Sequence, residues 1–257
     1  MSNYHLEVSV VSRKKGRSIA KLASYISGES LYDAYKDRTH HHHRQDVLYW
    51  KIFQPDNAPS EFYNLQSLCD AIEGAETRYD ARLAREFIGS LPNELPTQEL
   101  IQVVNEFIIT NFIEHDLCAI AAIHEGRNER TPEKSNPHVH IIVPTRTIGP
   151  EGFHQKKDRE HDRREYITIW REQWAFVQNQ AYERNGVSIR VSHESLKVQG
   201  ENREPTNYLY PIDWKKEQRG ERTLAGDKRR AIQQRNQERV KEPQRTMERE
   251  LEIDLCR

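Results

Sequence analysis

Two apolar segments of strand length, each with a histidine at one end, constrain the fold of this chain more than any other feature. Residues 117–124 end on His124, and residues 138–143 begin on His138. The stretch between them is polar, rich in charge and interrupted by Pro132 and Pro137, as is typical of a loop. The pattern therefore predicts two neighbouring antiparallel strands joined by that loop.

The rest of the chain alternates between strand and helix patterns. Period-two or β-rich runs predict further strands at residues 5–11, 47–53 and 187–192. Residues 82–91 fit either the end of a helix or a strand, and we favour a strand at 86–91. Apolar residues spaced by three and four predict helices that begin at Ser18, Ser60, Thr97 and about Arg164. The expected fold is α/β, with a central antiparallel sheet of about five strands and helices mainly on one face.

The last sixty residues differ in composition from the rest. Basic residues outnumber acidic ones beyond residue 215, and apolar residues are few. We therefore expect residues 196–257 to form a charged extension that is mainly helical or disordered. The three cysteines, Cys69, Cys118 and Cys256, are far apart and odd in number, which favours neither a disulfide framework nor a cysteine-based zinc site.

The histidines at the strand ends form a candidate metal site. His138 and His140 are two residues apart in a strand, so their side chains point to the same face. His124 can approach that face if its strand pairs antiparallel with theirs. Three neutral imidazoles can cap one face of a divalent ion and leave positions open for phosphate oxygen and water. The alternative is that alternate histidines in a strand are surface residues.

Several separated motifs carry a family resemblance. The matching residues are Ser12-Arg13, Gly16-Arg17-Ser18, residues 23–29 around Tyr25, residues 83–86 ending in Glu86, Leu91-Pro92, residues 122–125 around His124, and residues 136–142 around His138 and His140. With these motifs the chain resembles the MobA/MobL-type relaxases of mobilisable plasmids, which are members of the HUH endonuclease superfamily. The resemblance covers roughly residues 6–192, and a weaker similarity continues through residues 208–236.

The resemblance implies a role for each matching residue. Tyr25 corresponds to the nucleophile, His124, His138 and His140 to the ligands of a divalent metal, Mg²⁺ or Mn²⁺, and Glu86 to the supporting acid. The chain departs from the family at two places. The segment 126–135 is long and charged, and Ile88 stands where the family commonly has a second acid. Glu86 is therefore the first candidate acid, and Glu76 is the second.

The resemblance also implies a reaction and its partners. Residues 1–195 would be a relaxase domain that nicks one DNA strand at a plasmid transfer origin, forms a 5′-phosphotyrosyl link and later rejoins the strand. Its partners would be single-stranded origin DNA, accessory relaxosome proteins and a coupling protein. The chain has no apolar stretch long enough for a membrane span or a signal peptide, so we expect a cytoplasmic protein. We also expect it to act as a monomer on DNA.

Basic residues near Tyr25 are candidate DNA contacts. Arg13, Lys14, Lys15 and Arg17 could bind backbone phosphates beside the nucleophile, although such a run can also be a solvated face. The net charge of −1 neither indicates nor excludes a nucleic-acid partner. The histidine run at residues 40–43 is internal, and we interpret it as a loop beside the 47–53 strand.

Two other functions remain open at this point. A rolling-circle replication initiator or a transposase of the same superfamily would share the chemistry, but its tyrosine follows the histidine pair, whereas Tyr25 precedes His138. A non-catalytic single-stranded DNA-binding module would use the histidines structurally. Such a module would bind DNA without regard to chelators and would cleave no oligonucleotide.

Overall fold

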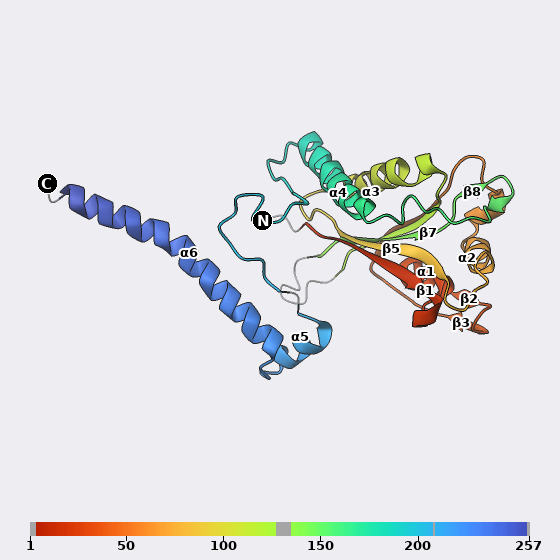
Figure 1. The fold of residues 1–257 in the computed structure, drawn as a ribbon, viewed down its shortest axis with the longest axis horizontal. Helices are drawn as coiled ribbons and strands as arrows, with labels where there is room; N and C mark the ends of the chain where they lie inside the picture. The colour runs from red at the N-terminus through yellow and green to blue at the C-terminus, as the bar shows by residue number, and fades with distance from the viewer. Residues whose placement is uncertain (1–3, 127–134, 208, 256–257) are drawn as a thin grey trace. The chain divides into compact units, whose positions relative to one another are not determined.

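The computed structural model describes residues 4–126, 135–207 and 209–255. The chain divides into two compact units, Met1–His193 and Glu194–Arg257. The first unit is built on a five-stranded sheet whose strands follow the order β1-β5-β7-β6-β4, and every neighbouring pair is antiparallel. Figure 1 labels β1, β5 and β7 of this sheet. The predicted sheet of about five antiparallel strands is confirmed.

The five strands correspond to segments with strand patterns. Their bounds are β1 Leu6–Ser12, β4 Val47–Phe53, β5 Arg82–Ser90, β6 Ala119–His124 and β7 His138–Pro144. Two small hairpins pair β2 Leu31–Asp33 with β3 Arg38–His40 and β8 Ile148–Gly149 with β9 Gly152–Phe153. The predicted charged loop between β6 and β7 falls mostly on residues 127–134, which lie outside the described residues.

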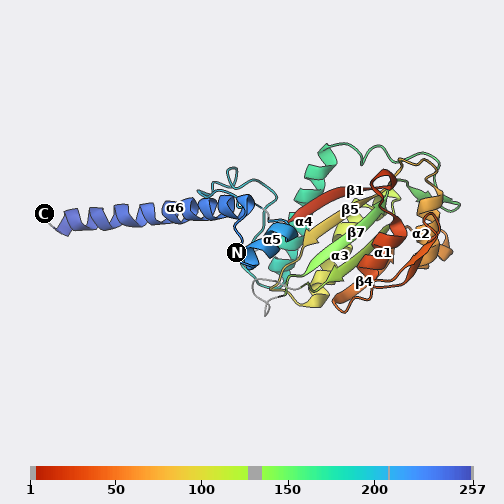
Figure 2. The ribbon, with the colours of Figure 1, turned by 90° about the horizontal axis from the view of Figure 1, so that it is seen from below.

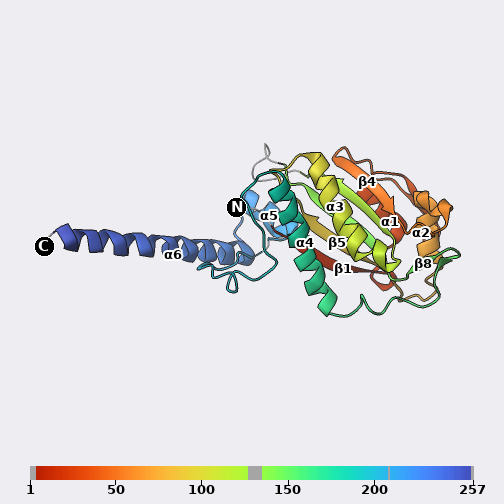
Figure 3. The same cartoon turned by 90° about the horizontal axis from the view of Figure 1, so that it is seen from above.

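Helices cover both faces of the sheet, whereas the sequence led us to expect them mainly on one. The long helices α3 Thr97–Asn111 and α4 Glu165–Arg184 pack on one face (Figure 3), and α1 Ile19–Ser27 and α2 Leu65–Gly74 on the other (Figure 2). The reason lies in β6, in which all six residues are buried. A strand that is apolar on both sides needs cover on both sides.

The ends of the helices follow local chemistry. The Ser18 side chain accepts a hydrogen bond from the Lys21 N–H at the start of α1, and Gly28 ends that helix in the left-handed region with φ 80°. The helical pattern that begins at Ser60 is split into a 3₁₀ turn, Ser60–Tyr63, and α2. The Asn64 side chain caps α2 by accepting from the Ser67 N–H. Two more 3₁₀ turns are Arg13–Lys15 and Ile113–His115.

The strand predicted at residues 187–192 is absent, which corrects the sequence interpretation. This segment follows α4 without pairing to another strand. The Asn179 side chain instead forms hydrogen bonds with the backbone of this segment. Asn179 Nδ2 donates to the Val191 carbonyl, and Asn179 Oδ1 accepts from the Val191 N–H. Val187 and Ile189 still pack against the core, so the apolar pattern reports burial and not strand pairing.

The second unit is helical where it has regular structure. It contains α5 Pro211–Gln218 and α6 Leu224–Leu255, which agrees with the predicted helical extension. Ion pairs hold its segments together, including those of Glu204 with Arg235 and Arg239 and that of Glu217 with Arg230. Within the described residues of the whole chain, we find no helix with the length and apolar character that a bilayer crossing requires.

Candidate functional site

Strand register brings the three predicted histidines together. His124, at the end of β6, lies directly opposite His138, at the start of β7, and Ala122 lies opposite His140. All three side chains therefore point to the face that carries α1 and α2. Their ring centroids are 5.0–5.4 Å apart, and one nitrogen from each ring lies within 4.8 Å of the others. Among the described residues, this cluster is the one with the spacing of a metal site.

Each imidazole has an acceptor on its outer side. His124 Nε2 lies 2.7 Å from the carbonyl oxygen of Ile26 in α1, and His138 Nδ1 lies 2.9 Å from the carbonyl of Asn136. His140 Nδ1 lies 3.7 Å from Oε1 of Glu86, which is too far for a hydrogen bond. A carbonyl can only accept, so the first two contacts place a proton on the outer nitrogen of His124 and of His138 and leave the other nitrogen of each ring unprotonated. Metal-binding histidines are held in this way.

Burial keeps two of the rings neutral. His124 is fully buried, and that burial lowers its pKa from 6.5 to about 4. Burial also lowers the pKa of His138. His124 Nδ1 is a buried nitrogen without a hydrogen-bond partner, which would be costly unless an ion or water filled the space in front of it. A divalent metal fits this donor set.

The low pKa of His124 has a consequence for stability. Between pH 6.5 and 4 the unfolded chain takes up a proton at this residue and the folded chain does not, so stability must fall as the pH falls through that window. We expect the metal-free protein to lose about 2 kcal/mol of unfolding free energy from this residue between pH 7.5 and 5. Urea unfolding at both pH values, in EDTA, measures the loss for the wild type and for His124→Gln. An equal loss in both proteins would contradict the assignment.

Glu86 is the acid beside the histidines. It lies on β5 opposite Ser9 of β1, and its carboxylate accepts from Ser9 Oγ at 3.2 Å and forms an ion pair with Arg17. Burial alone raises the pKa of Glu86, but the His140 ring and the Arg17 guanidinium outweigh that effect and hold the pKa below its usual value. An ionised Glu86 is therefore available to orient the Nδ1–H of His140.

Replacing Glu86 with glutamine tests that role. The amide keeps the shape of the side chain and loses the charge that holds the His140 ring. Changing such an outer partner of a metal-binding histidine typically weakens metal binding 10- to 100-fold, and we expect Glu86→Gln to weaken Mn²⁺ binding by about tenfold. Titration calorimetry of the metal-free protein measures this. Unchanged affinity would show that Glu86 serves only the ion pair with Arg17.

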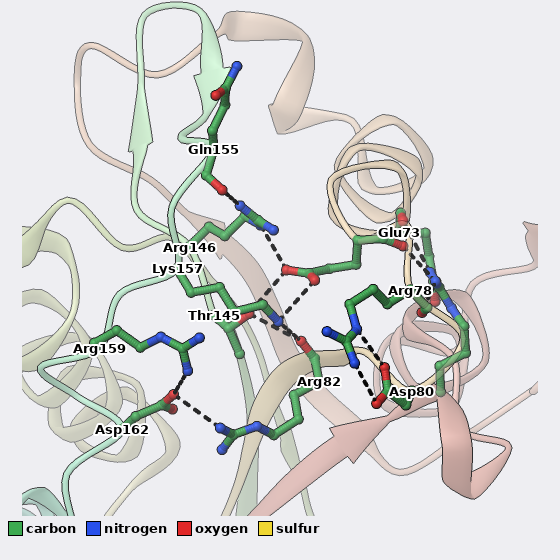
Figure 4. Close-up of polar contacts among 12 residues, drawn as sticks. Glu73, Arg78, Asp80, Arg82, Thr145, Arg146, Gln155, Lys157, Arg159 and Asp162 are labelled. Atoms are coloured by element: carbon green, nitrogen blue, oxygen red, sulfur yellow. Dashed lines mark hydrogen bonds and ion pairs between the residues drawn. The ribbon is translucent and has the colours of Figure 1, made fainter.

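Glu76, the second candidate acid, lies in a different cluster. It is buried and binds Arg146 at 2.7 Å, Lys157 at 2.9 Å and the Thr145 hydroxyl at 3.4 Å, and Figure 4 labels these three partners. These contacts tie the segment after β7 to the end of α2. The geometry therefore gives Glu76 a structural role and leaves Glu86 as the acid near the histidines.

Tyr25 reaches the histidine cluster from α1. It lies in the last turn of that helix, one residue before Ile26, whose carbonyl fixes His124. The ring centroid of Tyr25 is 5.8 Å from that of His140 and 6.2 Å from that of His124. The side chain is 39% exposed, so its ring touches the cluster and is also open to a ligand. Tyr25, from near the start of the sequence, therefore meets histidines that lie about a hundred residues later.

The predicted basic residues do not share one environment. Arg13 is buried, and its guanidinium donates to the carbonyls of Glu76, Arg78 and Glu73, so this structure does not present it on the surface where a DNA strand could lie. Its place at the end of β1 puts it against the end of α2. Lys14 and Lys15 are exposed and could contact phosphates, and Arg17 is half-buried against Glu86.

A groove runs beside Tyr25. It has a volume of about 280 Å³, and its lining residues are Lys15, Gly16, Arg17, Ser18, Lys21, Leu22, Tyr25 and His42. Three of these residues are basic. The groove includes His42, whose ring centroid is 5.8 Å from that of Tyr25, although we interpreted the histidine run as a loop and did not expect it to have a function. His40 belongs to β3 and pairs with Asp33, and residues 41–44 form the expected loop before β4.

Arg44 and Asp46 also belong to the site and escaped the sequence analysis. The Arg44 guanidinium lies over the Tyr25 ring, with Cζ 4.5 Å from the ring centroid. Asp46 holds that guanidinium through two hydrogen bonds. The one feature of the sequence that could have indicated these residues is that they form a charged pair just before an apolar strand. Charged residues commonly flank strands, so this feature does not by itself indicate a functional site.

Comparison with known proteins places the chain among mobilisation proteins. The probable mobilization protein MobA of Bifidobacterium longum is 28% identical over 249 residues, which cover 80% of this chain and 43% of that protein. The mobilization protein MobL of Acidithiobacillus ferridurans is 28% identical over 242 residues, which cover 82% of this chain and 62% of that protein. The chain thus spans about half the length of these two relatives.

A solved structure and a family model agree with these relatives. The structure reported as "Molecular Basis of Vancomycin Resistance Transfer in Staphylococcus aureus" superposes with a TM-score of 0.68 at 27% identity, covering 76% of this chain and all of that one. The model of the MobA/MobL family matches residues 17–219, from the groove beside Tyr25 to the end of α5. This match covers most of the sequence and includes all the clustered motif residues, and the chain therefore belongs to the MobA/MobL family.

Proposed function

We propose that this protein is a relaxase that cuts one strand of DNA with Tyr25 and remains joined to the 5′ end. The phenolic oxygen of Tyr25 forms a bond to the scissile phosphorus, and the bond from phosphorus to the 3′ oxygen breaks. The phenol gives up its proton, and the 3′ oxygen gains one to become a free hydroxyl. Because the phosphodiester energy is kept in the phosphotyrosyl link, the strand can later be rejoined. The observation that carries this proposal is the contact of Tyr25 with the histidine cluster.

The three histidines would hold a divalent metal that polarises the non-bridging oxygens of the phosphate and orients it for in-line attack. Hydrogen bonds to the carbonyls of Ile26 and Asn136 orient two of the rings, and the Glu86 carboxylate lies 3.7 Å from the third, which supports this proposal. Of the two ions expected, Mn²⁺ suits three nitrogen donors better than Mg²⁺, which prefers oxygen ligands and retains water.

The groove beside Tyr25 is the proposed path of the DNA strand. Lys15, Arg17 and Lys21 supply positive charge along it, and Tyr25 lies at one side. Phosphates bind to such charges without sequence readout, which fixes the strand in register with the nucleophile. Exposed Lys14, next to the groove-lining Lys15, extends the positive charge beyond the groove.

The names of the relatives support a proposed biological setting. Proteins named for mobilisation suggest that the DNA is a plasmid transfer origin in single-stranded or melted form, with accessory relaxosome proteins and a coupling protein as partners. We propose that the chain works in the cytoplasm as a monomer on DNA. In this proposal residues 1–195 form the catalytic domain, and residues 196–257 form an extension.

A covalent-adduct assay tests the function. The full chain is incubated with end-labelled single-stranded oligonucleotides that tile the transfer region of a mobilisable plasmid, with Mn²⁺ or with EDTA, and then denatured in SDS. We expect a protein–DNA band with Mn²⁺ and none with EDTA. Binding that ignores the chelator, together with no cleavage of any oligonucleotide, would instead indicate a non-catalytic binding module. An adduct formed only on a replication origin or transposon end would indicate the other members of the superfamily.

A further inference from the structure

Arg44 places a guanidinium group directly against the ring of Tyr25. It follows β3 in the chain, and its guanidinium lies against the Tyr25 ring at 4.5 Å from Cζ to the ring centroid. Hydrogen bonding to Asp46 raises the pKa of Arg44 most, and burial opposes this increase. Hydrogen bonding to Tyr25 is among the further causes that raise it. A permanent positive charge therefore lies at the nucleophile.

Asp46 fixes this charge in place. Its carboxylate accepts from Arg44 Nε at 2.8 Å and from Nη2 at 2.6 Å, a fork-to-fork geometry that leaves Nη1 directed elsewhere. The Arg44 guanidinium lowers the pKa of Asp46 to about 2, so the pair is ionised at neutral pH. The two side chains are only 18% and 31% exposed, and they are less screened by water than a surface pair.

The backbone ties the pair to the strands that carry the histidines. The Asp46 carbonyl accepts from the Glu125 N–H at 2.8 Å, immediately after His124. The next residue, Val47, lies opposite His124 in the register of β4 with β6. Arg44, Tyr25 and the histidine cluster thus lie at the same end of the sheet, beside the end of α1. The two hydrogen bonds to Asp46 hold the charge beside the nucleophile.

A second arginine–aspartate pair, also two residues apart in the sequence, lies on the surface. Arg78 and Asp80 form the same two hydrogen bonds, from Nε at 2.9 Å and from Nη2 at 3.1 Å. The Arg78 side chain is 78% exposed and lies in the loop before β5 (Figure 4). An arginine two residues before an aspartate therefore forms this fork by local geometry alone. The location of Arg44 at Tyr25 distinguishes the two pairs.

We propose that Arg44 is a catalytic residue whose free guanidinium N–H groups bind a non-bridging oxygen of the phosphate that Tyr25 attacks, and that Asp46 positions it. This inference rests on the proposed function. When the bond from Tyr25 to phosphorus forms and the bond to the 3′ oxygen breaks, negative charge builds up on the non-bridging oxygens. A planar, permanently charged donor held at the nucleophile stabilises that charge without reorganisation. The ring contact also keeps the phenol in its attacking orientation.

Single-turnover adduct formation at saturating oligonucleotide tests the proposal, with Arg78→Gln as the matched control. Removing one preorganised donor of this kind costs about 100- to 1,000-fold in rate. We expect Arg44→Gln to slow the step by about a hundredfold, with DNA affinity by fluorescence anisotropy and the thermal unfolding midpoint close to wild type. Arg44→Lys keeps the charge but not the fork and should fall between. Arg78→Gln should react at the wild-type rate.

Two further measurements separate a chemical role from a structural one. Added guanidinium ion should restore part of the rate of an Arg44→Ala protein, which a lost packing contact alone would not allow. Asp46→Asn should slow the step, and Asp46→Glu should recover part of the loss. An Arg44→Gln rate within threefold of wild type, or no rescue by guanidinium, would overturn the role of Arg44 and leave the relaxase function standing. A wild-type protein that forms no adduct would overturn both.

Discussion

Replacing Tyr25 with phenylalanine is expected to abolish the covalent protein–DNA product while leaving DNA binding in place. The change removes one oxygen atom and keeps the ring that contacts His140, His124 and Arg44. Because that oxygen is the proposed nucleophile, no other group of the variant can take over the same bond. We expect the rate of adduct formation to drop by at least about 10⁴-fold, below the detection limit of an SDS gel.

The matched control is Tyr63→Phe. Tyr63 is 60% exposed, lies in the 3₁₀ turn before α2, and is therefore accessible to a DNA strand without facing the histidines. This variant should form the adduct at the wild-type rate. An adduct that persists in Tyr25→Phe would assign the nucleophile to a different residue. Tryptic mapping of the labelled peptide would then identify it.

Removing one histidine of the cluster should have the second largest effect. His140 is the histidine that contacts both Tyr25 and Glu86, and His140→Ala leaves two imidazoles for the ion. A site that loses one of three protein ligands loses a large part of its affinity, more than the 10- to 100-fold that follows from changing an outer partner. We expect Mn²⁺ binding to weaken by at least about a hundredfold and adduct formation to fall in parallel.

His5→Ala serves as the control for that variant. His5 is exposed at the start of β1, where its nearest charged partner is Glu7 at 3.9 Å. Calorimetric titration with Mn²⁺ should give the wild-type affinity for this control. If His140→Ala retained wild-type metal affinity, the ion would be bound elsewhere. If it lost metal binding but kept full activity, the metal would have no part in the cleavage.

The sequence predicted the sheet and the histidine cluster for the same physical reason. Side chains alternate along a strand, so a histidine pair two residues apart must share a face, and antiparallel pairing then adds His124 to it. Helix patterns were equally informative, because Ser18 and Gly28 mark the ends of the helix that presents Tyr25. These are local rules, and they depend little on the rest of the fold.

What the sequence could not predict depends on tertiary packing. Arg13 is part of a basic run of the kind that is often a solvated face. Its guanidinium nevertheless donates hydrogen bonds to backbone carbonyls at and just after the end of α2. Arg44 and His42 acquire their significance only because a loop passes beside Tyr25. Helices on both faces of the sheet could have been predicted from β6, because its six residues are buried on both sides of the strand. The number of predicted helices did not by itself indicate which face each helix covers.

In the proposed function, Tyr25 lies beside a metal ion bound by His124, His138 and His140. The most direct measurement is anomalous diffraction from crystals of the protein containing Mn²⁺. We predict one strong peak bounded by Nδ1 of His124 and by the inward Nε2 atoms of His138 and His140, with the Tyr25 side chain facing it. A site that stays empty at saturating Mn²⁺, or a peak held by other residues such as those of the 40–43 run, would contradict the account.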